Sequence, residues 1–279
     1  MTILITGASG VVGRRVTSDL AGTRPIRTFG RSPLSDGSAE HVQGDVRDYD
    51  AVLAAMRGVD TVVHLSGFLE DLDPLETLEV NLRGTYHVLE AARLSGAARV
   101  VFASSIAVTG CLTASFIPDF LPIREDDACR PASAYAAGKL AAETLCDMYA
   151  RRFGLTTIAL RFAGVQHPET WTTPLWEQER CPILWTWISL GDLSRAIEAA
   201  IDAPIQGALV ATVAAADSCS FRPTRELAQE FCPSAVIREF EADAGEERWP
   251  MFSIQRARET LRWEPSDRFE DVFGTRVAG

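Results

Sequence analysis

The residue types and spacing that most clearly indicate chemistry in this sequence are those of Tyr135 and Lys139. Their spacing of four residues places both side chains on one face of a helix. A lysine ammonium beside a phenol favours the phenolate, so we expect the pKa of Tyr135 to lie below its ordinary value of about 10 and the side chain to act as a general acid or base. Lys139 is the only lysine among the 27 basic residues, which favours a specific role over that of an ordinary solvated helix residue.

Two hydroxyls follow the apolar stretch Arg99–Ala103, which we expect to form a buried strand. At the carboxyl end of such a strand, Ser104 or Ser105 can hydrogen-bond the oxygen of a carbonyl or an alcohol while Tyr135 transfers the proton. The other serine is then free to cap the strand end. The residues alone leave both assignments open.

A glycine-rich segment, Thr6–Gly13, joins a predicted strand to a predicted helix. Gly7 permits a tight turn, Gly10 allows the backbone to approach a pyrophosphate, and Gly13 allows the helix to pack on the strand. The free N–H groups at the start of the helix then face the phosphates. The pattern predicts a dinucleotide site, with a purely structural turn as the alternative. The contacts predicted in this loop are Gly7, Ser9, Gly10, Val11, Val12 and Gly13.

The end of the second predicted strand, Ile26–Phe29, indicates which dinucleotide binds. NAD-binding sites carry a carboxylate there for the ribose 2′-hydroxyl, whereas here Arg31 follows and no carboxylate occurs before Asp36. Arginine can form paired hydrogen bonds with a 2′-phosphate, so we predict NADP(H), with NAD(H) as the alternative if Arg31 is only solvated. The carboxylate of Asp45 is suited either to binding the adenine amino group or to forming a turn.

Apolar and amphipathic stretches alternate over the first 165 residues, which predicts a doubly wound α/β fold of the Rossmann type with a parallel sheet. The expected strands are Thr2–Thr6, Ile26–Phe29, Thr61–Leu65, Arg99–Ala103 and Thr156–Phe162. The expected helices are Val11–Ala21, Asp48–Met56, Leu75–Ser95 and Ser133–Phe153. We therefore expect an NAD(P)-binding domain over residues 1–165 and a small substrate-binding lobe over 166–279, with Rossmann elements returning around 183–215.

The second part of the chain holds all six tryptophans. We expect this part to cover the carboxyl edge of the sheet, where ligands bind in such folds. Candidates for lining a pocket there, with ordinary packing as the alternative, are Trp171, Trp176, Trp185 and Trp187. The tryptophans expected to be structural are Trp249 and Trp263.

The 279 residues carry a net charge of −11 with a pI of about 4.9, which disfavours nucleic acid as a partner because duplex binding needs a basic face. No apolar run approaches the roughly 20 residues needed to cross a bilayer, and we see no signal peptide. The six cysteines form no C-x-x-C pair, which predicts a reduced, cytoplasmic protein. The four histidines share no metal-ligand spacing and no serine lies in a G-x-S-x-G elbow, so we expect neither a metal nor hydrolase chemistry.

Further motifs extend along nearly the whole chain; they are Asp45–Val46, His64–Gly67, Val80–Thr85, Phe102–Ser105, Pro122–Lys139 and Ala257–Pro265. Together with the glycine-rich segment they resemble the extended branch of the short-chain dehydrogenase/reductase superfamily, which contains NAD(P)-dependent epimerases, dehydratases and reductases. The resemblance implies catalytic roles for Ser105, Tyr135 and Lys139, with Ser104 as the fallback. Beyond the glycine loop and Arg31, the predicted cofactor contacts are Asp45, Val46, Leu65, Ser66, Gly67, Asn81, Ala103, Tyr135, Lys139, Phe162 and Val165.

Departures from the family pattern bear on the reaction. Ile106 follows Ser105 where the 4,6-dehydratases of the family carry an Asp-Glu pair, so dehydration is not expected. The lobe is short and holds only Arg180 between residues 165 and 190, which favours a small, partly apolar substrate over a nucleotide sugar. Compact uronate dehydrogenases are similar in length and over Thr186–Pro204, but their substrate-carboxylate arginine has no clear counterpart. The predicted substrate contacts are Ser105, Ile106, Tyr135, Trp171 and Trp176.

We therefore expect an NADP(H)-dependent oxidoreductase that passes a hydride between the nicotinamide and a ketone or secondary alcohol, with Ser105 polarising the oxygen and Tyr135 moving the proton. The alternatives are a sugar or nucleotide-sugar epimerase with tightly held NAD, and a non-catalytic regulatory protein that senses the cofactor. The family often pairs through the two helices expected here over Leu75–Ser95 and Ser133–Phe153, which predicts a homodimer. Residues small enough for close contact there are Ala136, Ala137, Ala141, Ala142 and Leu145.

Overall fold

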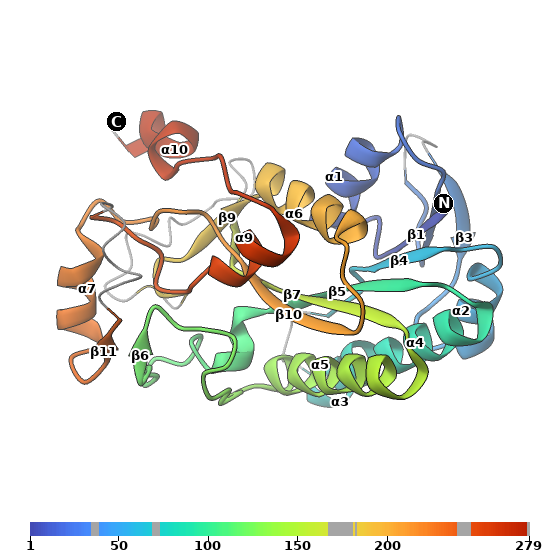
Figure 1. The fold of residues 1–279 in the computed structure, drawn as a ribbon, viewed down its shortest axis with the longest axis horizontal. Coiled ribbons are helices and arrows are strands. Elements are labelled where there is room, and N and C mark those ends of the chain that lie inside the picture. The colour runs from blue at the N-terminus through green and yellow to red at the C-terminus, as the bar shows by residue number, and fades with distance from the viewer. Residues whose placement is uncertain (35–38, 69–72, 167–180, 182, 239–246, 278–279) are drawn as a thin grey trace. The chain divides into compact units, whose positions relative to one another are not determined.

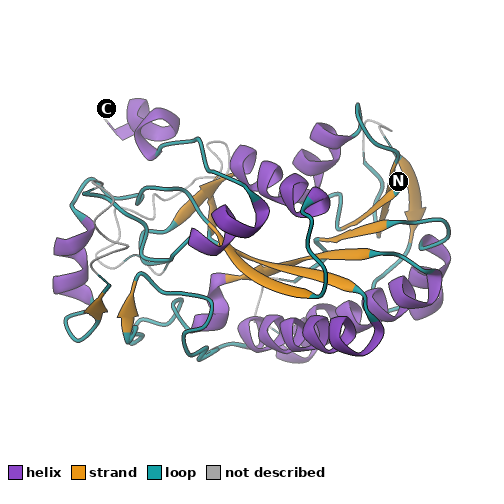
Figure 2. Cartoon of the chain, viewed as in Figure 1, coloured by secondary structure: helices purple, strands orange, loops and turns teal. Residues whose placement is uncertain are grey.

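A computed structural model describes residues 1–34, 39–68, 73–166, 181, 183–238 and 247–277 (Figures 1 and 2). Its largest sheet has seven strands in the order β10-β7-β5-β4-β1-β2-β3. These strands are β1 (Ile3–Thr6), β2 (Ile26–Gly30), β3 (Glu40–Gln43), β4 (Thr61–His64), β5 (Arg99–Ser105), β7 (Thr156–Phe162) and β10 (Ala208–Val213). The pairs β1–β2, β1–β4, β2–β3 and β4–β5 are parallel. The predicted Rossmann-type fold is confirmed.

Burial explains the composition of the inner strands. All residues of β1 and β4 are buried, so these strands are apolar on both faces rather than alternating. The polar exceptions are Thr6, Thr61 and His64. The ring nitrogens of His64 hydrogen-bond the hydroxyls of Thr6 at 2.7 Å and Thr85 at 3.1 Å. Burial lowers the pKa of His64 to about 3, so this side chain is neutral and has a structural role.

Helices lie on both faces of the sheet (Figure 1). One face is covered by α1 (Val11–Leu20), and the other by α2 (Tyr49–Ala55), α4 (Gly84–Ser95) and α5 (Ala134–Phe153). The second group of helices packs on an apolar core that includes Phe29, Phe102 and Tyr149. This packing provides the rigid base from which the ends of β1, β4 and β5 present their residues.

The helix expected over Leu75–Ser95 is interrupted. The chain forms α3 (Pro74–Leu78), a π-helical segment (Glu79–Arg83) and then α4. The helical segments before and after this π-helical turn each keep an apolar face. The 3.6-residue periodicity of the sequence therefore does not reveal the turn. The other predicted helices agree with the structure to within one residue at each end.

The described residues divide into two compact units that interleave along the chain. Unit 1 comprises Met1–Ser105, Ser133–Leu160 and Ile197–Val210. Unit 2 comprises Ile106–Ala132, Arg161–Ala196 and Ala211–Gly279. The boundary expected after residue 165 stays a prediction, because compactness alone does not define an independently folding domain.

Unit 2 is built from short elements. They are β6 (Phe120–Leu121), β8 (Gly164–Gln166), β9 (Trp187–Ser189), α7 (Thr224–Phe231), β11 (Val236–Ile237), α9 (Gln255–Leu261) and α10 (Phe269–Val277), while α6 (Leu190–Asp202) continues from unit 2 into unit 1. Trp185 and Trp187 are buried in the apolar core of unit 2, and Trp187 Nε1 donates a hydrogen bond to Asp217 at 3.1 Å. These two tryptophans therefore pack the core, as Trp249 and Trp263 do, whereas Trp171 and Trp176 lie outside the described residues.

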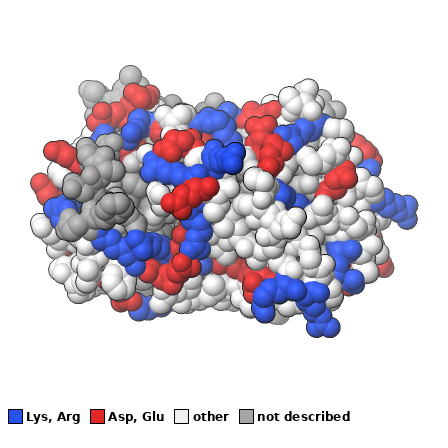
Figure 3. Space-filling view, viewed as in Figure 1, with Lys and Arg blue, Asp and Glu red and all other residues white. Residues whose placement is uncertain are grey.

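Acidic and basic side chains are intermixed over the face of the molecule in Figure 3. Within the described parts of the chain, no helix has both the length and the hydropathy required of a transmembrane span. The same residues contain no group of three or more His, Cys, Asp and Glu side chains arranged to hold a metal ion. All six cysteines are free thiols.

Candidate active site

The loop between β1 and α1 forms a cradle that only glycines allow. Gly7 has a φ of +71°, and a Cβ added there would lie 2.7 Å from the backbone nitrogen of Ser66. A Cβ added at Gly13 would lie 2.3 Å from the carbonyl oxygen of Gly7. Gly10 is the N-cap of α1, and no described side chain caps this helix, so its first N–H groups are available to an anion. The cradle fits the pyrophosphate of a dinucleotide.

A cavity of about 290 Å³ in unit 1 adjoins this loop. The predicted cofactor contacts that line it are Gly7, Ser9, Gly10, Arg31, Asp45, Val46, Leu65, Ser66 and Gly67. Residues that were not among the predicted cofactor contacts complete the lining: Gly30, Ser32, Gly44, Phe68, Glu76 and Val80. The predicted contacts outside this lining are Val11, Val12, Gly13, Asn81, Ala103, Tyr135, Lys139, Phe162 and Val165. Of these, Phe162 and Val165 belong to unit 2.

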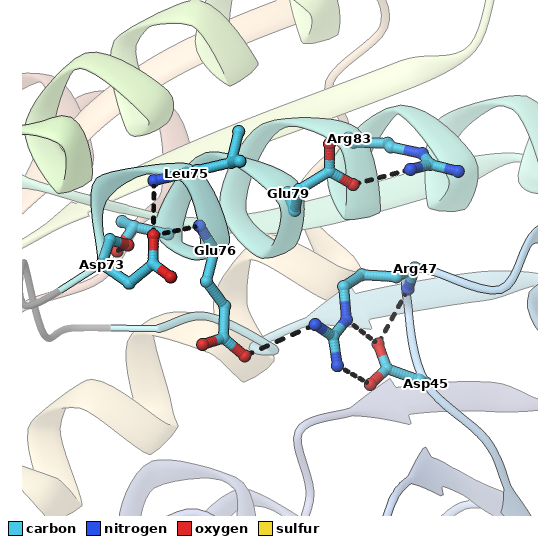
Figure 4. Close-up of polar contacts among 8 residues, drawn as sticks. Asp45, Arg47, Asp73, Leu75, Glu76, Glu79 and Arg83 are labelled. Atoms are coloured by element: carbon cyan, nitrogen blue, oxygen red, sulfur yellow. Dashed lines mark hydrogen bonds and ion pairs between the residues drawn. The ribbon is translucent and has the colours of Figure 1, made fainter.

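Two carboxylates of the cavity lining, Asp45 and Glu76, belong to an ion-pair network with Arg47 (Figure 4). Asp45 accepts hydrogen bonds from the Arg47 backbone at 2.9 Å and from its guanidinium at 2.7 and 3.0 Å, which lowers the pKa of the Asp45 carboxyl. Arg47 also reaches Glu76 of α3 at 3.4 Å. Asp45 therefore forms both the turn and part of the wall. The sequence did not point to Glu76, because nothing local links it to Arg47, which lies 29 residues earlier in the loop after β3.

The two serines at the end of β5 have different partners. Ser105 hydrogen-bonds the phenol of Tyr135, which lies in the first turn of α5. The hydroxyl of Ser104 instead donates to the Glu143 carboxylate at 2.5 Å. The structure thus brings Ser105 and Tyr135 together, while Ser104 faces a carboxylate that the sequence analysis did not identify.

The expected pKa shift of Tyr135 is wrong in direction. Burial raises the pKa of Tyr135, and the hydrogen bond from Ser105 acts against this rise without cancelling it. The Lys139 ammonium donates a hydrogen bond to the carbonyl oxygen of Ala103 at 2.7 Å and lies 5.8 Å from the centre of the Tyr135 ring. Spacing along a helix predicted that the two side chains are neighbours, but it carried no information on their desolvation.

Lys139 is almost fully buried, with 3% of its surface exposed. Burial lowers its pKa to about 8, while the Glu143 carboxylate acts in the opposite direction. Its ammonium also lies 4.9 Å from the ring centre of Phe102. A Cβ added at Gly67 would come within 3.2 Å of Nζ, so the chain segment after β4 passes directly beside it. The lysine is held in one position from several sides.

Asn81 lies in the π-helical segment and is fully buried. Its side-chain amide accepts a hydrogen bond from the Phe68 N–H at 2.8 Å and donates one to the Phe68 carbonyl at 2.9 Å. Asn81 therefore holds in place the segment Gly67–Phe68, which lines the cavity. π-helical segments occur often at functional sites, which agrees with this position.

Residues 3–170 match the family described as "NAD dependent epimerase/dehydratase family". A uronate dehydrogenase from Pseudomonas syringae pv. tomato is 34% identical over 74% of this chain and 71% of its own length. An L-arabinose 1-dehydrogenase (NAD(P)(+)) from Haloferax volcanii is 31% identical over 73% of this chain and 83% of its own length. The solved structure of uronate dehydrogenase from Agrobacterium tumefaciens is 29% identical, with a TM-score of 0.72, and covers 99% of this chain and 88% of that chain.

Proposed function

The chain belongs to the NAD dependent epimerase/dehydratase family, and from this premise we propose that it is an NAD(P)-dependent dehydrogenase acting on a secondary alcohol or ketone. The observation that carries the proposal is the contact of Ser105 with Tyr135 beside the buried Lys139, all within unit 1. The curated relatives named above are dehydrogenases, which supports oxidation of a sugar-like alcohol. The early resemblance to extended short-chain dehydrogenases is confirmed.

The residues have distinct roles in this proposal. A bound nicotinamide would supply the carbon that gives or takes the hydride. Ser105 orients the substrate oxygen, and Tyr135 gives or takes its proton. Lys139 provides positive charge near the phenol, and its ammonium is positioned by Ala103. The glycine loop, Leu65–Gly67 and Val46 would hold the dinucleotide along the cavity.

We test the proposal by following the absorbance of the reduced nicotinamide with uronates, L-arabinose and uncharged secondary alcohols. Tyr135→Phe should lower kcat by about 10²–10⁴-fold and leave the cofactor Kd unchanged, because only proton transfer is lost. Tyr49→Phe, on α2, is the matched control and should keep wild-type turnover. Epimerisation without net redox change would identify the enzyme as an epimerase. Cofactor binding without turnover, with Tyr135→Phe retaining full cellular function, would identify a sensor.

NADP(H) is the proposed cofactor because Arg31 and Ser32 line the cavity at the end of β2. A guanidinium there suits a 2′-phosphate, whereas the carboxylates of the cavity wall, Asp45 and Glu76, are held by Arg47. Arg31→Ala should weaken NADP⁺ binding about 10–100-fold, the effect of one lost charge-assisted hydrogen bond, and leave NAD⁺ binding unchanged. Calorimetry with both cofactors measures this, and exposed Arg57→Ala is the control. Equal losses for both cofactors would contradict the assignment.

The substrate class proposed is a small, partly apolar alcohol. The predicted contacts Trp171 and Trp176 lie outside the described residues, and Ile106 is buried in the core of unit 2, so Ser105 and Tyr135 carry this proposal. The sequence offers no clear arginine for a substrate carboxylate. We therefore expect uncharged sugars or alcohols to be oxidised with higher kcat/KM than uronates.

A homodimer through α4 and α5 is proposed as the working assembly. Of the small residues named on α5, Ala136 and Ala142 are buried within unit 1, which leaves Ala137, Ala141 and Leu145 at least partly exposed. The apolar or aromatic side chains exposed on these helices are Tyr86, Leu94 and Phe153. These surfaces support helix-to-helix pairing between two copies.

A further inference from the structure

A buried carboxylate lies one helical turn beyond Lys139 on α5. Glu143 has only 6% of its surface exposed, and its partner Ser104 has 2%. The Ser104 hydroxyl donates a hydrogen bond of 2.5 Å to the carboxylate. A buried carboxylate is strongly destabilising unless it is hydrogen-bonded or faces a positive charge, so its presence here calls for a reason.

Strand β5 and helix α5 determine where the charged groups of Lys139 and Glu143 lie. Ala103 and Ser104 are consecutive on β5; the first accepts the hydrogen bond from Lys139 and the second donates to Glu143. Lys139 and Glu143 are four residues apart, which puts them on the same face of α5. The two charged side chains are therefore anchored to neighbouring residues of one strand.

Apart from Glu143, the titratable groups found around Lys139 among the described residues are uncharged. They are His64 of β4, Tyr135 and Cys146 of α5. Burial holds the pKa of His64 at about 3 and raises the pKa values of Tyr135 and Cys146, so none carries charge near neutral pH. Among the described groups that act on Lys139, Glu143 is thus the one anion available when the lysine titrates.

We propose that Glu143 is the counter-ion that keeps Lys139 protonated in its buried position, with Ser104 holding the carboxylate. Glu143 is then a positioning residue, since it acts on Tyr135 only through Lys139. The inference deepens the proposed function and rests on it for its catalytic meaning. The electrostatic part concerns the protein alone and is measured without cofactor or substrate.

The single lysine makes a direct measurement possible. Protein labelled with ¹³C-lysine gives one lysine side-chain signal, that of Lys139, and its chemical shift against pH reports the protonation of Nζ. Glu143→Gln keeps the size of the side chain and an acceptor for Ser104 but removes the charge. We expect it to lower the titration midpoint by about one pH unit, the effect of losing a nearby opposite charge.

Matched variants separate this role from a general effect of charge or packing. Asp147→Asn removes a charge one turn further along α5, from an exposed side chain paired with Arg151 at 2.8 Å, and should not move the midpoint. Cys146→Ala should not move it either, because the thiol is neutral. Ser104→Ala should lower the midpoint by less than Glu143→Gln does, since the carboxylate loses its donor but keeps its charge.

The outcomes decide the inference in each case. An unchanged midpoint in folded Glu143→Gln, or an equal shift in Asp147→Asn or Cys146→Ala, would overturn it. If Glu143→Gln does not fold, Ser104→Ala decides: a lowered midpoint supports the counter-ion and an unchanged one overturns it. If the wild type also turns over substrate, kcat/KM should decline at a lower pH in Glu143→Gln than in the wild type. The difference should equal the shift of the Lys139 titration midpoint. A shifted midpoint in a protein without hydride transfer would refute the proposed function alone.

Discussion

The space between Gly67 and the Lys139 ammonium is too small for even a methyl side chain at residue 67. A Cβ at Gly67 would lie 3.2 Å from Nζ and 3.3 Å from Asn81 Oδ1, tighter than ordinary contacts. Gly67→Ala should therefore displace the lysine by a few tenths of an ångström and lower kcat about tenfold or more, because small misplacements at a reacting site are costly. Steady-state kinetics with saturating cofactor measures this effect.

Gly22→Ala is the matched control for that substitution. An added Cβ at Gly22 meets no described atom within 4 Å, so kcat should be unchanged. Thermal unfolding of both variants distinguishes a local displacement from a loss of stability. Wild-type kcat in folded Gly67→Ala would show that the position of Lys139 tolerates this shift, and the tight packing around it would then have no bearing on turnover.

The sequence predicted which residues lie at the site better than it predicted how deeply they are buried and what surrounds them. Helical spacing predicted that Tyr135 and Lys139 are neighbours, and the strand end predicted a serine beside them. The choice of Ser105 over Ser104 came from the family resemblance, and Ser105 is the serine that contacts Tyr135. The direction of the Tyr135 pKa shift could not be predicted, since it depends on burial by segments far along the chain. Glu143 was missed for the same reason: a glutamate on a helix is ordinarily solvated, and only the fold turns it toward Ser104.

The start of α5 determines where the phenol lies. Ser133 is the N-cap of this helix, and its hydroxyl accepts a hydrogen bond from the Ala136 N–H at 3.1 Å. Ser133→Ala should destabilise the protein by about 1 kcal/mol. Because Tyr135 lies in the turn that frays, kcat should also fall about tenfold. Thermal unfolding and turnover measure the two effects, and Ser133→Thr should restore both.

A substitution at the N-cap of α2 is the control for Ser133→Ala, because it should destabilise the protein by a similar amount. Asp48 accepts hydrogen bonds from the N–H groups of Asp50 at 3.1 Å and Ala51 at 3.2 Å, so Asp48→Ala should also cost about 1 kcal/mol. This helix carries no proposed catalytic residue, and kcat should remain that of the wild type. Equal losses of kcat in both variants would mean that general destabilisation, rather than the position of Tyr135, is responsible.

Element types were predictable where burial or capping residues mark them. Apolar strands such as β7 and the capped helix α5 were located closely, whereas the π-helical segment over Glu79–Arg83 was not. That segment turns Asn81 inward to hold both backbone groups of Phe68, a tertiary requirement with no local signature. The Arg47–Glu76 ion pair is likewise a consequence of the assembled fold.

At the scale of the molecule, the proposed catalytic and cofactor residues described in detail lie within unit 1. The contacts of Ser105 with Tyr135, of Lys139 with Ala103 and of Glu143 with Ser104 all lie within this one compact unit, so they do not depend on an arrangement of the two units. Chain length and element order predicted a second, smaller lobe and a return of Rossmann elements around 183–215, but not that Ile106–Ala132 belongs to the second unit. The strand β10, which lies in that returning segment, pairs beside β7 at the edge of the main sheet, and the sequence does not specify this strand order.

The proposed dimer places the same helix α5 at the site and at the subunit surface. A charge introduced at exposed Thr144, midway along α5, would be buried without a partner if two copies pair there. Thr144→Arg should therefore weaken self-association by at least about tenfold, measured by sedimentation over a range of concentrations. Ser18→Arg, on α1 at the opposite face of the sheet (Figure 1), should leave association unchanged. A wild type that sediments as a monomer throughout, or a Thr144→Arg variant that pairs as the wild type does, would remove α4 and α5 as the interface and leave the intact site in unit 1 to act within a single chain.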